Sequence, residues 1–138
     1  MLDYQLRSIK RVIRARRRNE DKRQTICDAI TQMRPIEFFY RGGYRTVEPF
    51  ALGIVLNDRA DNESLLCFQT RGLSELLEVE GWKLYRVSDM TDMVILNEKF
   101  TGDRPGYDPD NLEMAYVICC VRLVKKAEEP VEPPPAPK

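Results

Sequence analysis

The spacing of apolar residues changes near residue 36, and this change most limits what the chain can fold into. Before it, apolar residues recur at helical steps, as Ile26, Ala29, Ile30 and Met33. Asp21 and Gln24 have capping-box spacing, Asn19 is an alternative cap, and Pro35 disfavours helix in the residue before it. After Pro35, apolar residues alternate with polar ones in short runs. The sequence therefore predicts a capped helix followed by a sheet.

Six runs have the composition of strands: 36–40, 44–56, 64–70, 82–87, 90–97 and 114–124. Pro49 predicts a bend or an edge position in the second run. The last run is apolar on both faces, so we expect a well-covered strand, with a helix as the alternative. A chain of 138 residues closes one hydrophobic core. We therefore expect a mainly β, α+β fold with N-terminal helices, built on a small, strongly bent antiparallel sheet or barrel of five to six strands.

Charge divides the chain into three parts, which we expect to be a basic helical arm (1–19), a barrel domain (20–125) and a disordered proline-rich tail (126–138). Residues 1–23 hold nine basic and three acidic residues, whereas residues 24–125 hold 11 basic and 16 acidic ones. The arm has a thin apolar stripe and is either a solvated amphipathic helix or a helix that approaches phosphates. Its basic residues are Arg7, Lys10, Arg11, Arg14, Arg16, Arg17 and Arg18.

The chain has no histidine, which excludes histidine-based triads and acid–base chemistry. Its four cysteines match no zinc spacing, and without a secretory signal we expect free, buried thiols and a cytoplasmic location. No apolar segment is long enough to span a membrane. Four acidic residues in one loop could hold a metal, but such loops are commonly solvated turns; they are Asp103, Asp108, Asp110 and Glu113. We therefore expect a non-enzymatic protein without a cofactor or metal.

The stretch FFYRGGYRTVEP, from Phe38 to Pro49, has the pattern of a hairpin. A two-residue type I′ turn at Gly42-Gly43 would pair Tyr40 with Arg45 and Arg41 with Tyr44. By alternation, Tyr40 and Arg45 then extend the core-facing side toward one end of the sheet, whereas Arg41 faces outward. A guanidinium in such a position needs carboxylates, carbonyls or a bound anion.

Two further arginines end predicted strands. Arg71 closes the third strand, and Arg86 shares a face with Trp82 and Leu84 on the fourth. Three arginines at strand ends on core-side faces are typical either of an anion site or of separate salt bridges with nearby carboxylates, such as Glu37, Glu48 and Asp89.

Residues 26–100 resemble a WYL domain in the order and spacing of their elements. The most specific pieces are Arg45-x-Val47-Glu48-Pro49-Phe50-x-Leu52 and Leu84-x-Arg86-Val87. The resemblance implies an Sm-like, SH3-type β-barrel that senses ligands. It also implies that nucleic acid or a nucleotide binds a basic pocket, in proteins that regulate transcription or accompany anti-phage and CRISPR systems. Only about 25 residues precede the matched region, so we expect a stand-alone module without the winged-helix domain of the family's regulators.

Within the resemblance, Arg45, Arg71 and Arg86 match the family's basic pocket positions. The chain departs from the family at its namesake tripeptide, because Ser64-Leu65-Leu66 stands where the family has Trp-Tyr-Leu. Tyr40, Phe68 or Trp82 could replace the missing aromatic residues as a stacking surface. The candidate binding residues are thus Arg45, Arg71, Arg86, Tyr40, Arg41 and Trp82.

Two functions follow from these patterns. The first is a regulatory module that binds single-stranded RNA, single-stranded DNA or a nucleotide-like anion, with the arm adding non-specific affinity. The second is a protein–protein interaction or scaffold subunit that self-associates through its N-terminal arm, because so thin an apolar stripe is stable only when packed. We also expect a homo-oligomer that does not associate with a membrane, and a protein partner is compatible with both functions.

Overall fold

The computed structural model of the chain describes residues 10, 20–74 and 79–122. Within them, a helix at residues 20–32 is followed by six strands that form one sheet. The strands are β1 (Ile36–Tyr40), β2 (Gly43–Val55), β3 (Glu63–Gly72), β4 (Gly81–Arg86), β5 (Thr91–Ile95) and β6 (Met114–Cys120). A short 3-10 helix, η1 (Val87–Asp89), separates β4 from β5. The expected mainly β, α+β fold with six antiparallel strands is confirmed.

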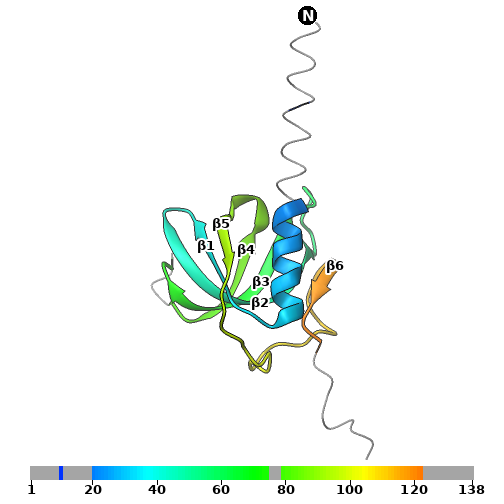
Figure 1. Ribbon diagram of the computed structural model, residues 1–138. Coiled ribbons are helices and arrows are strands. Elements are labelled where there is room, and N and C mark those ends of the chain that lie inside the picture. Colours follow the sequence, from blue (N-terminus) through cyan, green and yellow to red (C-terminus); the bar gives the residue numbers. More distant parts are fainter. Residues whose placement is uncertain (1–9, 11–19, 75–78, 123–138) are drawn as a thin grey trace, which may run out of the picture.

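The helix lies beside the curved sheet (Figure 1). The strand order is β4-β3-β2-β1-β5, and β6 pairs with β2 off this path. β2 is long enough to pair with β1 near its start and with β6 near its end, while β3 runs along its other side. The register with β3 shifts between Pro49 and Ala51, as expected of a residue that cannot donate a ladder hydrogen bond. The predicted irregularity at Pro49 is therefore confirmed.

The helix contributes one apolar face to the core. Ile26 and Ala29 are fully buried, and Ile30 is nearly so, which confirms the predicted helical face. The helix ends as expected before Pro35, where Met33 adopts a positive φ of 55°. The backbone N–H of Arg34 then donates to the carbonyl of Ala29 at 2.9 Å, which closes the last turn. The chain consequently enters β1 directly from the helix.

The turn between β1 and β2 is centred on Arg41 and Gly42, not on Gly42 and Gly43. Arg41 and Gly42 have φ of 42° and 88°, the two positive values that a type I′ turn requires. Gly43 instead begins β2, where an added Cβ would lie 2.7 Å from the side chain of Leu73. Close packing, rather than turn geometry, therefore requires the second glycine.

This turn shifts the predicted register by two residues. Phe38 pairs with Arg45 and Tyr40 with Gly43, so the expected Tyr40–Arg45 pairing is wrong. A shift of two keeps every side chain on its predicted face, because the side-chain period of a strand is also two. Tyr40 and Arg45 accordingly share the buried face, as predicted.

The expectation of four free thiols is wrong for two of them. Cys27 on the helix and Cys119 on β6 form a disulfide with a Cα–Cα distance of 5.9 Å. They are 92 residues apart, so only the tertiary fold brings them together and their spacing carries no signal. Cys67, which is buried, and Cys120 remain free thiols.

β6 is shorter and more exposed than expected. It ends at Cys120 rather than at residue 124, and Tyr116 and Val117 are exposed. Among the described strands β6 pairs only with β2, so it is an edge strand with a hydrogen-bonded neighbour on one side. The basic arm, except for the helical and exposed Lys10, and the whole proline-rich tail lie outside the described residues.

Candidate anion-binding site

The sheet bends until side chains of β1 and β4 touch, although β3 and β2 lie between these strands in the sheet. Tyr40 at the end of β1 and Tyr85 on β4 have ring centroids 4.7 Å apart. Phe38 packs edge-on against both rings, at 6.2 Å and 5.2 Å. Aromatic contacts therefore join the two strands at the hairpin end of the sheet.

Arg45 lies beside these aromatic rings. Its guanidinium carbon is 5.0 Å from the ring centroid of Tyr40 and 5.1 Å from that of Tyr85. Its Nη1 donates a hydrogen bond to the Tyr85 hydroxyl at 3.0 Å. Arg45 is only 3% exposed, and burial of a cation is costly unless hydrogen bonds and ring faces stabilise it. The two tyrosines thus hold a positive charge in a position from which most water is removed.

A buried polar chain continues beyond Arg45. The Tyr85 hydroxyl donates to Oε1 of Gln69, which is completely buried. Nε2 of Gln69 then donates to the carbonyl of Leu73 at 2.9 Å. Burial raises the pKa of Tyr85, against the opposing effect of the hydrogen bond from Arg45, so the hydroxyl is protonated at neutral pH. This chain fixes the Tyr85 hydroxyl as acceptor from Arg45 and as donor to Gln69.

A cavity of about 310 Å³ opens beside this cluster. Arg45, Arg41 and Lys83 line it, together with Tyr40, Ser74, Trp82, Leu84 and Tyr85. None of these described lining residues is acidic. A hollow lined by charges of one sign concentrates the electric field and attracts ions of the opposite sign. The described part of the lining therefore carries positive charge, and the cavity volume is at the lower end of the usual size range for small-ligand pockets.

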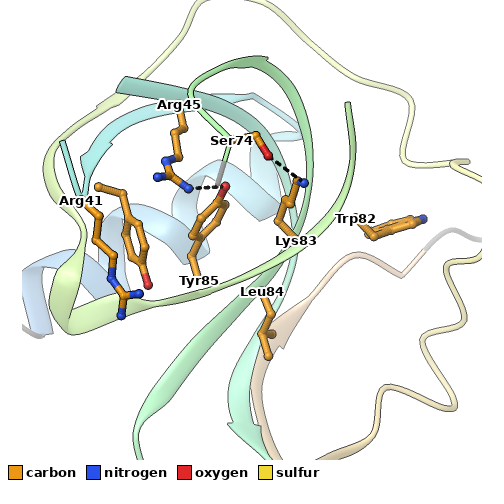
Figure 2. A pocket seen from close by; sticks show the side chains of 8 residues that line it. Arg41, Arg45, Ser74, Trp82, Lys83, Leu84 and Tyr85 are labelled. Atoms are coloured by element: carbon orange, nitrogen blue, oxygen red, sulfur yellow. Dashed lines mark hydrogen bonds between the residues drawn. The ribbon is translucent and has the colours of Figure 1, made fainter. Parts of the chain in front are cut away.

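Arg41 approaches the cavity from the β1–β2 turn, and Lys83 approaches it from β4. The guanidinium of Arg41 lies 5.3 Å from the Tyr40 ring centroid and forms an ion pair with Asp89 at 3.5 Å. Nζ of Lys83 donates to Oγ of Ser74 at 3.2 Å (Figure 2). Arg41 was expected to face outward; its side chain is exposed, and it nevertheless lines the cavity at its rim.

Four of the six predicted binding residues line the cavity: Tyr40, Arg41, Arg45 and, on one wall, Trp82. Arg71 is not among them, because its side chain is 59% exposed and pairs with Glu98 at 3.2 Å. For Arg71 the structure thus matches the alternative of a separate salt bridge. Arg86 is exposed and lines a neighbouring hollow rather than this cavity.

The buried face of β4 is the opposite of the one expected. Tyr85 is buried, whereas Leu84 and Arg86 are exposed. Cys67 of β3 faces Lys83, and Leu65 faces Tyr85, so the inner faces of the two strands coincide. Lys83 and Tyr85 were consequently missed as site residues. The full burial of Cys67 and Leu65 sets the phase of β4, and this cross-strand information is absent from β4's own sequence.

Trp82 points away from the Arg45 cluster in Figure 2, although it lines one wall of the cavity. Its Nε1 donates to the carbonyl of Pro105 at 3.0 Å. Its ring packs against Phe50 and Phe68, with centroids at 4.9 Å and 5.5 Å, and stacks on Tyr107. The main role of Trp82 is therefore to hold the 101–110 loop on the sheet.

Residues 20–74 and 79–122 contain no group of three or more cysteine or acidic side chains placed to hold a metal ion. In the acidic loop, Asp103 accepts a hydrogen bond from Thr101, Asp110 pairs with Arg122 at 3.4 Å, and Asp108 accepts from the backbone N–H of Asp110. These carboxylates stabilise turns, as one of the two interpretations of the loop expects.

Comparison of the chain with protein-family models, with curated proteins and with solved structures finds no match. Among the described residues, no helix combines the length and the apolar character needed to cross a membrane.

Proposed function

We propose that this protein is a non-enzymatic ligand-sensing module that binds phosphate groups of a nucleotide or of single-stranded nucleic acid. The observation that carries the proposal is Arg45, a nearly buried guanidinium at the wall of a cavity that also receives Lys83 and Arg41. Burial of a charge is costly, and buried ionic interactions are weak evidence for a gain in stability. A protein that keeps such a charge beside an open cavity gains most from it when an anion binds there.

The tyrosines favour phosphate over base as the recognised group. Tyr40 and Tyr85 are 6% and 4% exposed, so their faces hold the guanidinium and are not open to a stacking base. Guanidinium and ammonium groups in a poorly hydrated site form strong, charge-assisted hydrogen bonds with phosphate oxygens. The missing aromatic pair at Ser64-Leu65 is consistent with this preference.

The resemblance to WYL domains points in the same direction. It implies an Sm-like barrel whose basic pocket senses nucleic acid or nucleotides, and the six-stranded bent sheet supports that proposal. In this account the module regulates transcription or an anti-phage or CRISPR system, and its arginine-rich arm adds affinity for the phosphate backbone. In this chain the basic residues that line the pocket are Lys83, Arg45 and Arg41.

A binding panel tests the proposal. Fluorescence anisotropy with labelled single-stranded RNA, single-stranded DNA and duplex, each at two salt concentrations, is combined with calorimetric titration of adenosine and its monophosphate. We expect binding of the phosphate-bearing ligands, weakening with salt, and none of adenosine. Lys83→Met should weaken binding about tenfold, the size of one charge-assisted hydrogen bond. Lys99→Met, which removes an exposed lysine outside the cavity lining, serves as the matched control. Equal binding by Lys83→Met and wild type would count against the cavity.

A second candidate is the self-associating interaction subunit. The exposed edge of β6 favours it, because Tyr116 is 63% exposed on a strand that pairs on one side only among the described strands. Gel filtration of the full chain and of a chain lacking residues 1–18 separates arm-mediated from body-mediated association. An unchanged oligomeric mass after truncation excludes the arm as the cause.

A further inference from the structure

A second hollow adjoins the cavity. Its volume is about 430 Å³, and it shares Tyr40, Arg41 and Leu84 with the first cavity. Because three residues line both hollows, they are neighbouring parts of one groove between the tip of the β1–β2 hairpin and strand β4. We call the two parts the inner cavity, with Arg45 and Lys83, and the outer hollow, with Arg86.

The two parts offer positive charge at separate places. Lys83 lines the inner cavity and Arg86 the outer hollow. These residues are three positions apart on β4, which corresponds to about 10 Å along the strand. Their side chains also leave opposite faces of β4, because the spacing is odd. One phosphate group therefore cannot contact both cations at once.

Exposed leucines and Arg41, which both hollows share, line the groove between Lys83 and Arg86. Leu84 lies between Lys83 and Arg86 and is 51% exposed, and Leu56 at the outer hollow is 52% exposed. Exposed leucines can pack against the sugar or the base of a nucleotide, whereas they make no favourable contact with a continuous polyphosphate. Asn57 and Ser64 also line the outer hollow and supply polar groups beside Arg86.

We propose that the groove binds a single-stranded oligonucleotide of at least two nucleotides, with one phosphate in the inner cavity and a following phosphate at Arg86. This inference rests on the proposed function and extends it from a phosphate site to a chain-binding groove. Sugar and base between the two phosphates cover Leu84. Asp58 lines the outer hollow as well, where its carboxylate opposes the incoming phosphate and limits affinity.

The test compares ligands of increasing length: adenosine monophosphate, adenosine triphosphate, a dinucleotide and a tetranucleotide, each titrated calorimetrically. The account predicts that the dinucleotide binds at least about tenfold more tightly than the monophosphate, the gain of one added charge-assisted contact. Its salt dependence should be steeper by roughly 0.7 in logarithmic slope. A triphosphate that binds as tightly as the dinucleotide overturns the proposal, because it places the second charge without sugar or base.

Two variants locate the second phosphate. Arg86→Gln should lose about tenfold in dinucleotide affinity and leave monophosphate affinity within about twofold. Arg71→Gln, an exposed arginine on β3 that lines neither hollow, is the matched control and should change neither value. Asp58→Asn should strengthen dinucleotide binding and not monophosphate binding. Equal affinity of wild type and Arg86→Gln for the dinucleotide overturns the groove.

The two proposals fail in different ways. If no phosphate-bearing ligand binds, the proposed function is wrong, and the proposal of an oligonucleotide-binding groove is wrong as well. If the monophosphate binds with the expected dependence on Lys83, while added nucleotides bring no affinity, the proposed function stands and the groove alone is wrong.

Discussion

Removal of one hydroxyl, by Tyr85→Phe, perturbs the buried polar chain at its centre. The Tyr85 hydroxyl accepts from Nη1 of Arg45 at 3.0 Å and donates to Oε1 of Gln69. Phenylalanine keeps the ring contacts with Phe38 and Tyr40, so the change removes polar contacts and little packing. The variant therefore isolates what these two hydrogen bonds contribute to the free energy of unfolding.

The expected cost follows from what the substitution leaves behind. Gln69 is fully buried, so its Oε1 would lose its donor out of reach of water, which costs about 1–3 kcal/mol. Arg45 would lose a charged hydrogen bond, worth up to about 3 kcal/mol, but its position beside an open cavity lets water replace part of it. We expect the free energy of unfolding to fall by about 2–4 kcal/mol in total.

Urea denaturation followed by circular dichroism measures this change, with the slope of unfolding checked for constancy. Tyr44→Phe is the matched control, because Tyr44 is 53% exposed and its hydroxyl can hydrogen-bond to water; its effect should stay within about 0.5 kcal/mol. A Tyr85→Phe cost no larger than that of Tyr44→Phe would refute the reasoning.

Three further outcomes concern stability. Alkylation of the unfolded, unreduced protein should label two thiols and not four, and replacement of Cys27 and Cys119 by alanine should lower the free energy of unfolding by about 2–5 kcal/mol, as expected for a cross-link that closes a long loop. Burial raises the pKa of Cys67 above its unfolded value of about 8.5, so the buried thiol contributes its full stabilisation below that pH and less above it. The free energy of unfolding should therefore fall by about 2 kcal/mol between pH 8 and pH 10, and Cys67→Val should remove this pH dependence. Gly72→Ala should cost more than about 2 kcal/mol, because φ is +107° and the new Cβ would meet a backbone carbonyl of β2 at 2.2 Å. Gly42→Ala, with a similar φ and open space, should cost less, and equal unfolding midpoints for the two variants would contradict the packing argument.

Local patterns were sufficient to predict most elements. The bounds of β1 agree with the prediction, those of β2 agree within one residue, and the helix ends before Pro35 as predicted, because proline and alternation act over a few neighbouring residues. The predicted cap at Asp21 is wrong, because Asp21 is helical and Gln24 donates to Asp28. The burial of Tyr40 and Arg45 on one face was predicted despite a wrong register, since an error of two residues leaves every face unchanged.

The site itself depends on contacts that no local pattern encodes. The phase of β4 is set by its pairing with β3, which turns Lys83 and Tyr85 inward and Arg86 outward. Arg71 lies near the end of β3, and β3 pairs with β2, the strand that carries Arg45. The side chain of Arg71 nevertheless pairs with Glu98, 27 residues further along the chain, away from the cavity. Both outcomes depend on contacts between segments that lie apart in the sequence, which alternation within a strand does not specify.

The central claim is that Arg45 binds an anion, beyond its contacts with Tyr40 and Tyr85. Its most direct test is a pair of substitutions, Arg45→Met and Arg71→Met, each measured for anisotropy with a labelled single-stranded tetranucleotide and for urea unfolding. The account predicts that Arg45→Met stays folded and loses at least about tenfold in affinity, whereas Arg71→Met binds as wild type does. The lost hydrogen bond to Tyr85 should lower the free energy of unfolding by up to about 3 kcal/mol. Wild-type affinity in a folded Arg45→Met protein would contradict the account.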